Sequence, residues 1–363
     1  MSMAARTIGR SVSLTEATPI LLGLLDDLPG GIERWDAQAA IDLAVADVAR
    51  ARGRQVTVQW ATSKVEGLPR GSAWAVEQGF RRLADQGVLG IIGPGIGDDA
   101  LSVASLVQRL EIPTLHWSGA ERARGTFLFH YQFGALESDS IVLARHLAEQ
   151  GYGRVAVLQE RSAIGGVFGS SFTRAASNEG LDVVATQAHW PGEKPPVPAI
   201  EVLSHTDAAA LVYLGLGWAA PAVRQALGQA HCELPVFMTS SGIWGHIQPD
   251  FARHLDGFTY VDTYSDRNTR HGHIHDRLYG ASRRRGPGAA LFHDMAFLMV
   301  DAAVRAAPLS RTGLRDALED NPMVPAASGQ PGTMMGFGHY DRAALKGSYL
   351  VVRRWQDGQS VEV

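Results

Sequence analysis

Short aliphatic runs alternate with longer amphipathic stretches along most of this chain. The runs at residues 56–61 and 114–117 have the length and composition of strands, whereas apolar residues recur at helical spacing through residues 36–52. Alternating strands and helices predict βαβ units, which form parallel sheets covered by helices on both faces. The sequence therefore predicts an α/β fold.

The alternation occurs in two successive series. In the first series we expect strands at 7–14, 56–61, 90–92 and 114–117, and helices at 36–52, 72–86 and 98–109. After a loop at 119–125 we expect strands at 154–159, 183–189, 209–214 and 236–239, helices at 138–150, 166–179 and 221–229, and a proline-rich loop at 191–198. Beyond Phe258 only a long helix at 289–307 and a closing strand at 348–355 stand out. Two α/β lobes fit this order better than one continuous sheet.

Composition excludes several classes of protein. A length of 363 residues suggests two domains, and the net charge of −4 gives no general attraction to nucleic acid or to an anionic membrane. Cys232 is the only cysteine, so neither an internal disulfide nor a thiolate zinc site is expected. No segment has the roughly 20 apolar residues of a membrane span, and the run at 20–25 is too short for a secretory signal. We expect the chain as written to be cytoplasmic, or periplasmic or at the cell surface if a leader was trimmed.

Four segments together resemble a known family. They read GIIGP at 90–94, EIPTL at 111–115 with Ser118-Gly119 after it, RVAVL at 154–158, and GFGHYD at 336–341 with Gly347 after it. In this order and spacing, over most of the chain, they resemble the type I periplasmic binding proteins. The branch that they resemble includes branched-chain amino-acid, urea and amide receptors.

The resemblance implies two Rossmann-like lobes with parallel sheets, joined by a hinge and closing on a small ligand. It implies an N-terminal lobe of residues 1–120 plus about 256–325 and a C-terminal lobe of residues 121–255 plus about 326–363. Ligands of α/β sheets bind beyond the carboxyl ends of the strands, where helix N-termini expose N–H groups. The ligand-binding residues that we expect there are Gly95, Ile96, Gly97, His116, Trp117, Ser118, Gly119, Tyr131, Ile164, Trp218, Ser240, Ser241 and Trp244.

Departures from the family narrow the expected ligand. In members that bind amino acids, a second-lobe carboxylate holds the ammonium group of the ligand, whereas the corresponding strand end here reads Thr239-Ser240-Ser241-Gly242. A buried ammonium group without a partner is very costly, so an α-amino acid is not expected. Isoleucines and tryptophans at the expected cleft favour an apolar or aromatic compound, with His116 or Ser118 holding a carboxylate or carbonyl group. The tryptophans could equally belong to the cores of the lobes.

Two glycine motifs could suggest a cofactor. The pattern G-x-G-x-x-A occurs at 95–100 and again at 215–220. Such glycines let a pyrophosphate approach backbone N–H groups, but neither motif is followed by the acidic residue that a dinucleotide site requires. Both are therefore interpreted as tight strand-to-helix turns, and no cofactor is expected.

A histidine cluster raises the question of a metal. His271, His273 and His275 alternate along a segment that we interpret as an extended, flexible loop. Three imidazoles on one side of such a segment could ligate zinc or nickel. Three nearby arginines would repel a cation, which favours a solvated cluster over a metal site.

These features predict a solute-binding protein, not an enzyme, that closes on a small hydrophobic or aromatic organic ligand. Its other partner would be an ABC permease, or a regulatory protein if the chain is a cytoplasmic sensor of the amide-sensor type. Neither nucleic acid binding nor membrane insertion is expected, and the protein would be a monomer or a homodimer. An enzyme on a doubly wound fold is a further hypothesis, but the sequence has no nucleophile elbow, P-loop or His-Glu-x-x-His motif.

Overall fold

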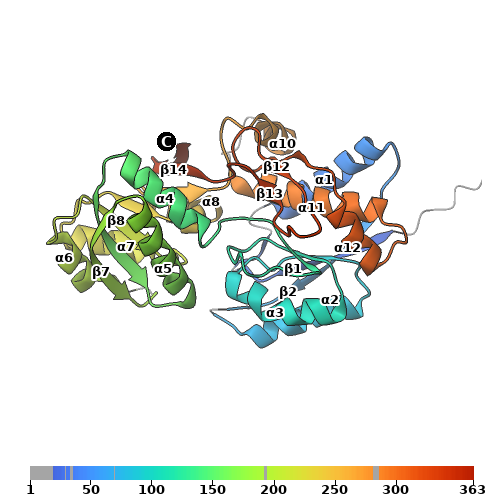
Figure 1. Ribbon diagram of the computed structural model, residues 1–363, viewed down its shortest axis with the longest axis horizontal. Coiled ribbons are helices and arrows are strands. Elements are labelled where there is room, and N and C mark those ends of the chain that lie inside the picture. The colour runs from blue at the N-terminus through green and yellow to red at the C-terminus, as the bar shows by residue number, and fades with distance from the viewer. Residues whose placement is uncertain (1–18, 29, 33–35, 69, 192–193, 281–285) are drawn as a thin grey trace, which may run out of the picture.

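The computed structural model describes residues 19–28, 30–32, 36–68, 70–191, 194–280 and 286–363. These residues form two α/β lobes, which lie side by side along the long axis of the molecule (Figure 1). The predicted fold class is confirmed. The strand predicted at 7–14 lies outside the described residues, within which the first strand is β1 (Ile20–Asp26).

The first lobe contains a five-stranded parallel sheet with the order β2-β1-β3-β4-β5. Besides β1, its strands are β2 (Val58–Lys64), β3 (Ile91–Ile92), β4 (Thr114–His116) and β5 (Leu128–His130). Figure 1 shows two helices on one face of this sheet, α2 (Ala73–Asp85) and α3 (Gly97–Leu110). The other face is covered by α1 (Ala37–Arg52), α11 (Pro287–Arg305) and α12 (Arg311–Glu319). A small antiparallel sheet adjoins this lobe: β11 (Val324–Pro325), β12 (Met334–Met335) and β13 (Leu345–Lys346).

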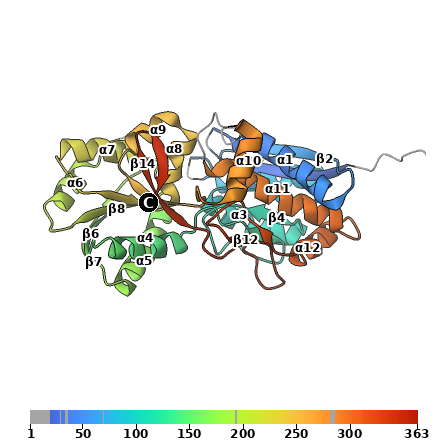
Figure 2. The same ribbon diagram turned by 90° about the horizontal axis from the view of Figure 1, so that it is seen from above.

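The second lobe contains a seven-stranded sheet with the order β15-β14-β10-β9-β8-β6-β7. Its parallel strands are β6 (Arg154–Glu160), β7 (Asp182–His189), β8 (Ala210–Leu214), β9 (Val236–Met238) and β10 (Thr259–Asp262). A hairpin of β14 (Val351–Gln356) and β15 (Gln359–Glu362) extends the edge in the antiparallel sense. Figure 2 shows α4 (Ser138–Glu149) and α5 (Ala163–Asn178) on one face, and α6 (Val197–Ser204), α7 (Ala220–Gln229) and α9 (Pro249–His254) on the other. Two short helical turns follow β9, η2 (Ser240–Ile243) and α8 (Trp244–Ile247).

The chain passes between the lobes three times, at residues 131–137, 263–268 and 347–350. The sequence predicted lobe boundaries at residues 120 and 255. The sheets place β5 in the first lobe and β10 in the second, so the first passage lies beyond residue 120 and the second beyond residue 255. Residues 326–346 stay with the first lobe, because β12 and β13 pack on its core. We therefore propose that the boundaries between the two lobes lie at these three passages.

Short-range chemistry fixes several helix ends near their predicted positions. The Ser72 hydroxyl accepts a hydrogen bond from the Ala75 N–H at the start of α2, and Ser162 does the same for Gly165 at the start of α5. Side chains of this type satisfy N–H groups that the first helical turn leaves unpaired. Gly53 ends α1 in the left-handed conformation, with φ of 61°, which favours glycine.

Two expectations about local structure are wrong. Residues 269–279 form the helix α10 (Thr269–Tyr279), not an extended loop, because Asn268 caps its first turn. Helix α6 begins inside the segment expected to be a loop, since a proline in the first turn of a helix lacks only an N–H that would be unpaired there.

Helix α11 meets the length and composition of a membrane span, which the sequence analysis did not expect of any segment. It has 19 residues, and its most apolar window has a mean hydropathy of 1.2. However, 89% of that window is buried inside the molecule, and the helix packs along α1. Its apolar surface is therefore covered by the protein itself.

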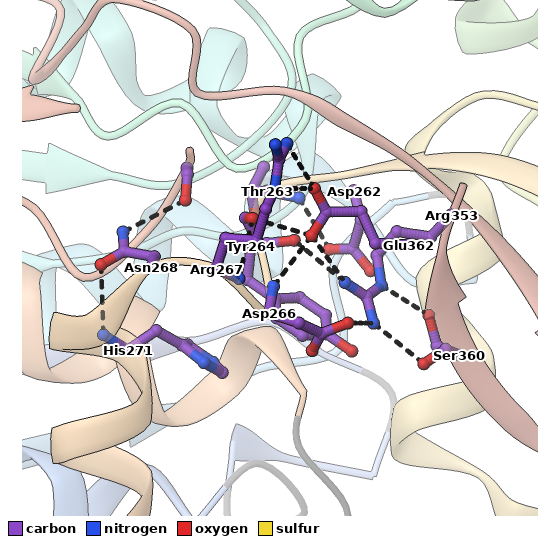
Figure 3. A network of polar contacts seen from close by, with 12 residues as sticks. Asp262, Thr263, Tyr264, Asp266, Arg267, Asn268, His271, Arg353, Ser360 and Glu362 are labelled. Carbon is purple, nitrogen blue, oxygen red and sulfur yellow. Dashed lines mark hydrogen bonds and ion pairs between the residues drawn. The ribbon is translucent and has the colours of Figure 1, made fainter. Parts of the chain in front are cut away.

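A polar network ties the second passage to the C-terminal hairpin (Figure 3). Arg353 on β14 is fully buried, and its guanidinium group donates to the Ser360 hydroxyl at 2.7 Å and to an Asp266 carboxylate oxygen at 2.9 Å. It also lies 3.9 Å from the centre of the Tyr264 ring. Buried charges need such partners, so this network fixes the end of the chain against the residues that join the lobes.

Candidate ligand-binding site

A cavity of about 90 Å³ lies between the lobes, at the carboxyl ends of their strands. Nine of the residues predicted from the sequence line it: Gly95, Ile96, Gly97, Trp117, Gly119, Ile164, Ser240, Ser241 and Trp244. The first five follow β3 and β4 of the first lobe, and the other four belong to the second lobe. The structure thus brings together loops from both halves of the chain, and their contact with a ligand stays a prediction.

The rest of the lining was not named among the predicted ligand-binding residues, although Leu216 and Ile243 lie within strand-end loops expected to face the cleft. It consists of Leu28, Phe133, Leu136, Phe168, Gly215, Leu216 and Ile243. Phe168 lies one helical turn beyond Ile164 on α5, so helical spacing could have indicated it. Phe133 and Leu136 belong to the first passage between the lobes, which no local pattern marks.

Two tryptophan rings in the cavity wall are held in place by contacts within the protein. Trp117 is 3% exposed and meets the rings of Phe133 and Phe292 edge-on, at centroid distances of 5.6 and 5.4 Å. Trp244 donates its indole N–H to the carbonyl oxygen of Leu216 at 2.6 Å. Edge-on ring contacts and a bonded indole N–H hold both side chains in place. These tryptophans are therefore core residues and cavity walls at once.

Four predicted residues lie outside the cavity, and three of them, His116, Ser118 and Tyr131, use their polar groups within the protein. His116 is buried, bonds the Ser118 hydroxyl at 3.0 Å and stacks on His130 at 4.4 Å. Burial lowers the pKa of His116 to about 3, so its ring is neutral. The Ser118 hydroxyl also accepts the Ala120 N–H, at 3.2 Å. The expectation that His116 or Ser118 faces a ligand group is therefore not met.

Tyr131 and Trp218 are the other two. The Tyr131 hydroxyl contacts a carboxylate oxygen of Asp294 at 2.9 Å and the Ser328 hydroxyl at 2.8 Å, deep in the first lobe. Trp218 instead lines a neighbouring pocket of about 420 Å³ and packs edge-on against Trp244 at 5.6 Å.

That second pocket is polar. It is lined by Asp26, Asp27, Leu28, Gly30, Gly31, Lys64, Val65, Glu66, Gly67, Leu68, Arg70 and Trp218. The Arg70 guanidinium group lies 4.9 Å from the centre of the Trp218 ring and so links the two lobes. Leu28 lines both spaces, which makes the polar pocket a neighbour of the apolar cavity.

Buried carboxylates accept hydrogen bonds from backbone N–H groups around the cavity. Asp27 accepts from Gly95 and Ile96, Glu160 accepts from Leu216 and Gly217, and Asp139 accepts from Ser240. Burial raises the pKa of each of these acids, that of Asp139 to about 6, and the nearby Asp99 raises that of Asp27 further. Of the residues whose N–H groups are used in this way, Gly95, Ile96 and Ser240 were predicted to bind the ligand.

The histidine cluster does not form a metal site in the part of the chain that the structure describes. On α10, His271 and His275 lie one turn apart and are buried, whereas His273 is exposed on another side. Across the described ranges, no group of three or more His, Cys, Asp or Glu side chains could hold a metal ion.

Comparison with known proteins now decides the family. Residues 19–359 match a family model described as "Periplasmic binding protein". The chain belongs to this family. It is a family of binding proteins, not of enzymes, and the resemblance drawn from the sequence is confirmed. No curated protein matches the chain.

Solved structures of periplasmic binding proteins share its fold. An ABC transporter substrate-binding protein from Desulfitobacterium hafniense, in complex with Leu, has a TM-score of 0.76 at 17% identity, covering 95% of this chain and 100% of the other. A type 1 periplasmic binding protein from Bordetella pertussis Tohama I has a TM-score of 0.78 at 14% identity, with 95% and 100% covered. The leucine binding protein LivK from Thermotoga maritima has a TM-score of 0.78 at 15% identity, with 95% and 97% covered. At these identities the likeness is one of fold.

Proposed function

We propose that this periplasmic binding protein closes on a small hydrophobic or aromatic organic ligand that is not an α-amino acid. The observation that carries this proposal is the lining of the interlobe cavity, in which the described residues include no charged side chain. A ligand ammonium group there would be buried among apolar side chains while the nearby carboxylates of Asp27, Asp139 and Glu160 are engaged by backbone N–H groups, which is very costly. Apolar rings and isoleucine side chains from both lobes instead favour apolar contact.

The size of the cavity sets a further limit on the ligand. A dry apolar cavity of ~150 Å³ holds benzene, so a cavity of about 90 Å³ suits only a small group. A larger ligand would extend past Leu28 into the polar pocket. We therefore favour a compound with a compact apolar end and a neutral polar end that reaches this pocket, whose lining carries both acidic and basic side chains.

We further propose that the protein is the substrate-binding component of an ABC transporter and acts outside the cytoplasm. This rests on its family and on the described roles of structural relatives that include the Desulfitobacterium hafniense protein. A cytoplasmic ligand sensor is the alternative that the sequence analysis left open. Fractionation of cells that express the native gene with its own start tests this point, because a transporter component must leave the cytoplasm.

A thermal-shift screen tests the ligand class. Neutral aromatic compounds, apolar amides, hydrophobic acids and leucine would each be added to the purified protein. A ligand at 100 times its dissociation constant stabilises the folded state by about 2.7 kcal/mol, which is easily measured. We expect stabilisation by compounds of the first two groups. Stabilisation by leucine at similar concentrations would refute the proposed class.

A pair of variants assigns the stabilisation to the cavity. Ile164→Arg places a charge in the apolar lining, and we expect it to abolish the shift caused by any ligand found. Ile141→Arg is the matched control, because Ile141 on α4 is 46% exposed and is not among the lining residues. An unchanged shift in Ile164→Arg would place the ligand elsewhere.

A further inference from the structure

The two lobes share an arrangement that the glycine motifs alone do not reveal. In the first lobe, Asp27 directly follows β1, and its two carboxylate oxygens accept the N–H groups of Gly95 at 2.7 Å and Ile96 at 2.8 Å. These N–H groups belong to the turn after β3, the neighbour of β1 in the sheet. One acid thus fills the turn that leads into α3.

The second lobe repeats this arrangement with a different acid. Glu160 ends β6, and its carboxylate accepts the N–H groups of Leu216 at 2.8 Å and Gly217 at 3.3 Å. This turn follows β8, the neighbour of β6. In both lobes the acid comes from the end of one strand and the Gly-x-Gly turn from the end of an adjacent strand.

Both acids are part of the packed interior. Asp27 is 4% exposed and Glu160 is fully buried, and the Tyr213 hydroxyl also donates to Glu160. A Cβ atom on Gly215 would lie 2.1 Å from the carboxyl carbon of Glu160, so the glycine makes room for the acid and not for a ligand phosphate. Each turn is shaped around a carboxylate that the chain itself supplies.

Successive backbone N–H groups in a turn form a concave site that binds anions, and a helix that follows the turn adds partial positive charge. Here two oxygens of the protein already occupy the place of such an anion in each lobe. We propose that Asp27 and Glu160 are specificity-determining residues that close both Gly-x-Gly turns to carboxylate and phosphate groups of ligands. This inference rests on the proposed function. It narrows the class of ligand, since it excludes compounds that would bind these turns through an anionic group.

Chemical rescue tests the proposal without knowledge of the ligand. Asp27→Ala and Glu160→Ala each remove the internal carboxylate and leave a space that formate or acetate can enter. We expect these anions to raise the melting temperature of both variants by about 2–4 °C when they are present well above their dissociation constants. Formamide and acetamide, which have similar shapes but no charge, should have a much smaller effect.

Two controls isolate the effect of the turns. The wild-type protein in the same solutions should not be stabilised, because its turns are filled. Leu22→Ala, a buried position on β1, provides a destabilised protein whose turns are intact, and formate should leave it unchanged. Equal stabilisation of Leu22→Ala, or no stabilisation of either acid-to-alanine variant, would overturn the proposal.

The wild-type protein gives a second test if the alanine variants do not fold. The amide resonances of Gly95, Ile96, Leu216 and Gly217 should not shift when formate, acetate or phosphate is added. Saturable shifts at these amides would contradict the proposal. A carboxylate ligand bound at these amides would refute this inference and leave the binding function standing. If formate or acetate rescues the variants but no apolar ligand is found in the screen, the inference would stand and the proposed ligand class would fail.

Discussion

Trp117 shows how one side chain can serve both the core and the cavity. Its ring is packed edge-on against Phe133 and Phe292, yet the same ring lines the space between the lobes. A Cβ atom on Gly95 would lie 2.6 Å from this ring, so the turn after β3 rests directly on it. The side chain thus holds the wall in position as well as forming it.

Removal of this ring should therefore cost stability and affinity together. We expect Trp117→Ala to lower the free energy of unfolding by about 3–5 kcal/mol in urea denaturation. It should also weaken binding of an apolar ligand by roughly 1–3 kcal/mol. Trp74→Ala is the control, because Trp74 is 69% exposed and its loss should change stability by no more than about 0.5 kcal/mol. Equal effects of the two substitutions would show that Trp117 is not packed as described.

Asp139 should make stability depend on pH. It is buried, and burial raises its pKa to about 6, above the value of about 4 in an unfolded chain. Between these values the folded state keeps a proton that the unfolded state releases, so the free energy of unfolding falls as pH rises from about 4 to 6. The full effect is about 3 kcal/mol.

The comparison with Asp139→Asn isolates this contribution from other titrating groups. The stability of the wild type relative to the variant should fall across pH 4–6 and become constant above about pH 7. Chemical denaturation at a series of pH values measures it. A difference that rises with pH over that range would mean that Asp139 is stabilised as a carboxylate.

Among the elements, Asn268 joins α10 to the loop that follows β11. Its side-chain oxygen accepts the N–H groups of Arg270 and His271, which caps α10. Its amide nitrogen lies 3.1–3.4 Å from the carbonyl oxygens of Ala326, Ala327, Ser328 and Gly329. One side chain thus serves a helix end and a neighbouring loop.

Two substitutions separate these roles. Asn268→Asp keeps the capping oxygen but loses the donor to the carbonyl groups, and we expect it to destabilise by about 1–3 kcal/mol. Asn268→Ala loses the cap as well and should cost about 1 kcal/mol more. Urea denaturation and hydrogen exchange of the α10 amides provide the measurements. Equal loss of hydrogen-exchange protection at the first α10 amides in both variants would show that the cap contributes nothing.

The sequence was sufficient for elements with a strong local pattern and not for those defined by their neighbours. Helix α1 and strands β6 and β8 were predicted within a few residues, because each has its own apolar period. Strand β10 has only four residues, and its pairing with β9 and β14 identifies it. Helix α10 was missed because glycine and histidine are weak helix formers, and the buried cap at Asn268 was not visible in the sequence.

For the candidate site, the sequence predicted the positions of the loops but not the directions of their side chains. Strand-end loops could be located, since parallel sheets place them at one edge. The direction of a side chain within such a loop could not, and His116 turned into the core. Asp27 and Gly95 are 68 residues apart in the sequence. Their hydrogen bond could be predicted only with knowledge that β1 and β3 are paired.

At the scale of the whole molecule, Arg70 and Trp218 connect the lobes across the mouth of the polar pocket. If closure accompanies binding, this contact stabilises the closed form only. We expect Arg70→Ala to raise the dissociation constant of a ligand about two- to fivefold in calorimetry, as for a partly exposed cation–π contact. Arg161→Ala is matched to it, because Arg161 lies 5.9 Å from the Trp190 ring within the second lobe. If both substitutions weaken binding equally, the contact does not act through closure.

The C-terminal hairpin has a practical consequence. Ser360 and Glu362 lie on the last strand, yet their oxygen atoms contact Arg353 and Arg267 beside the second passage between the lobes. Truncation at residue 358, or a purification tag that pulls β15 away, would therefore disturb the residues that join the two lobes. Binding should be measured on protein in which residues 359–363 are left native.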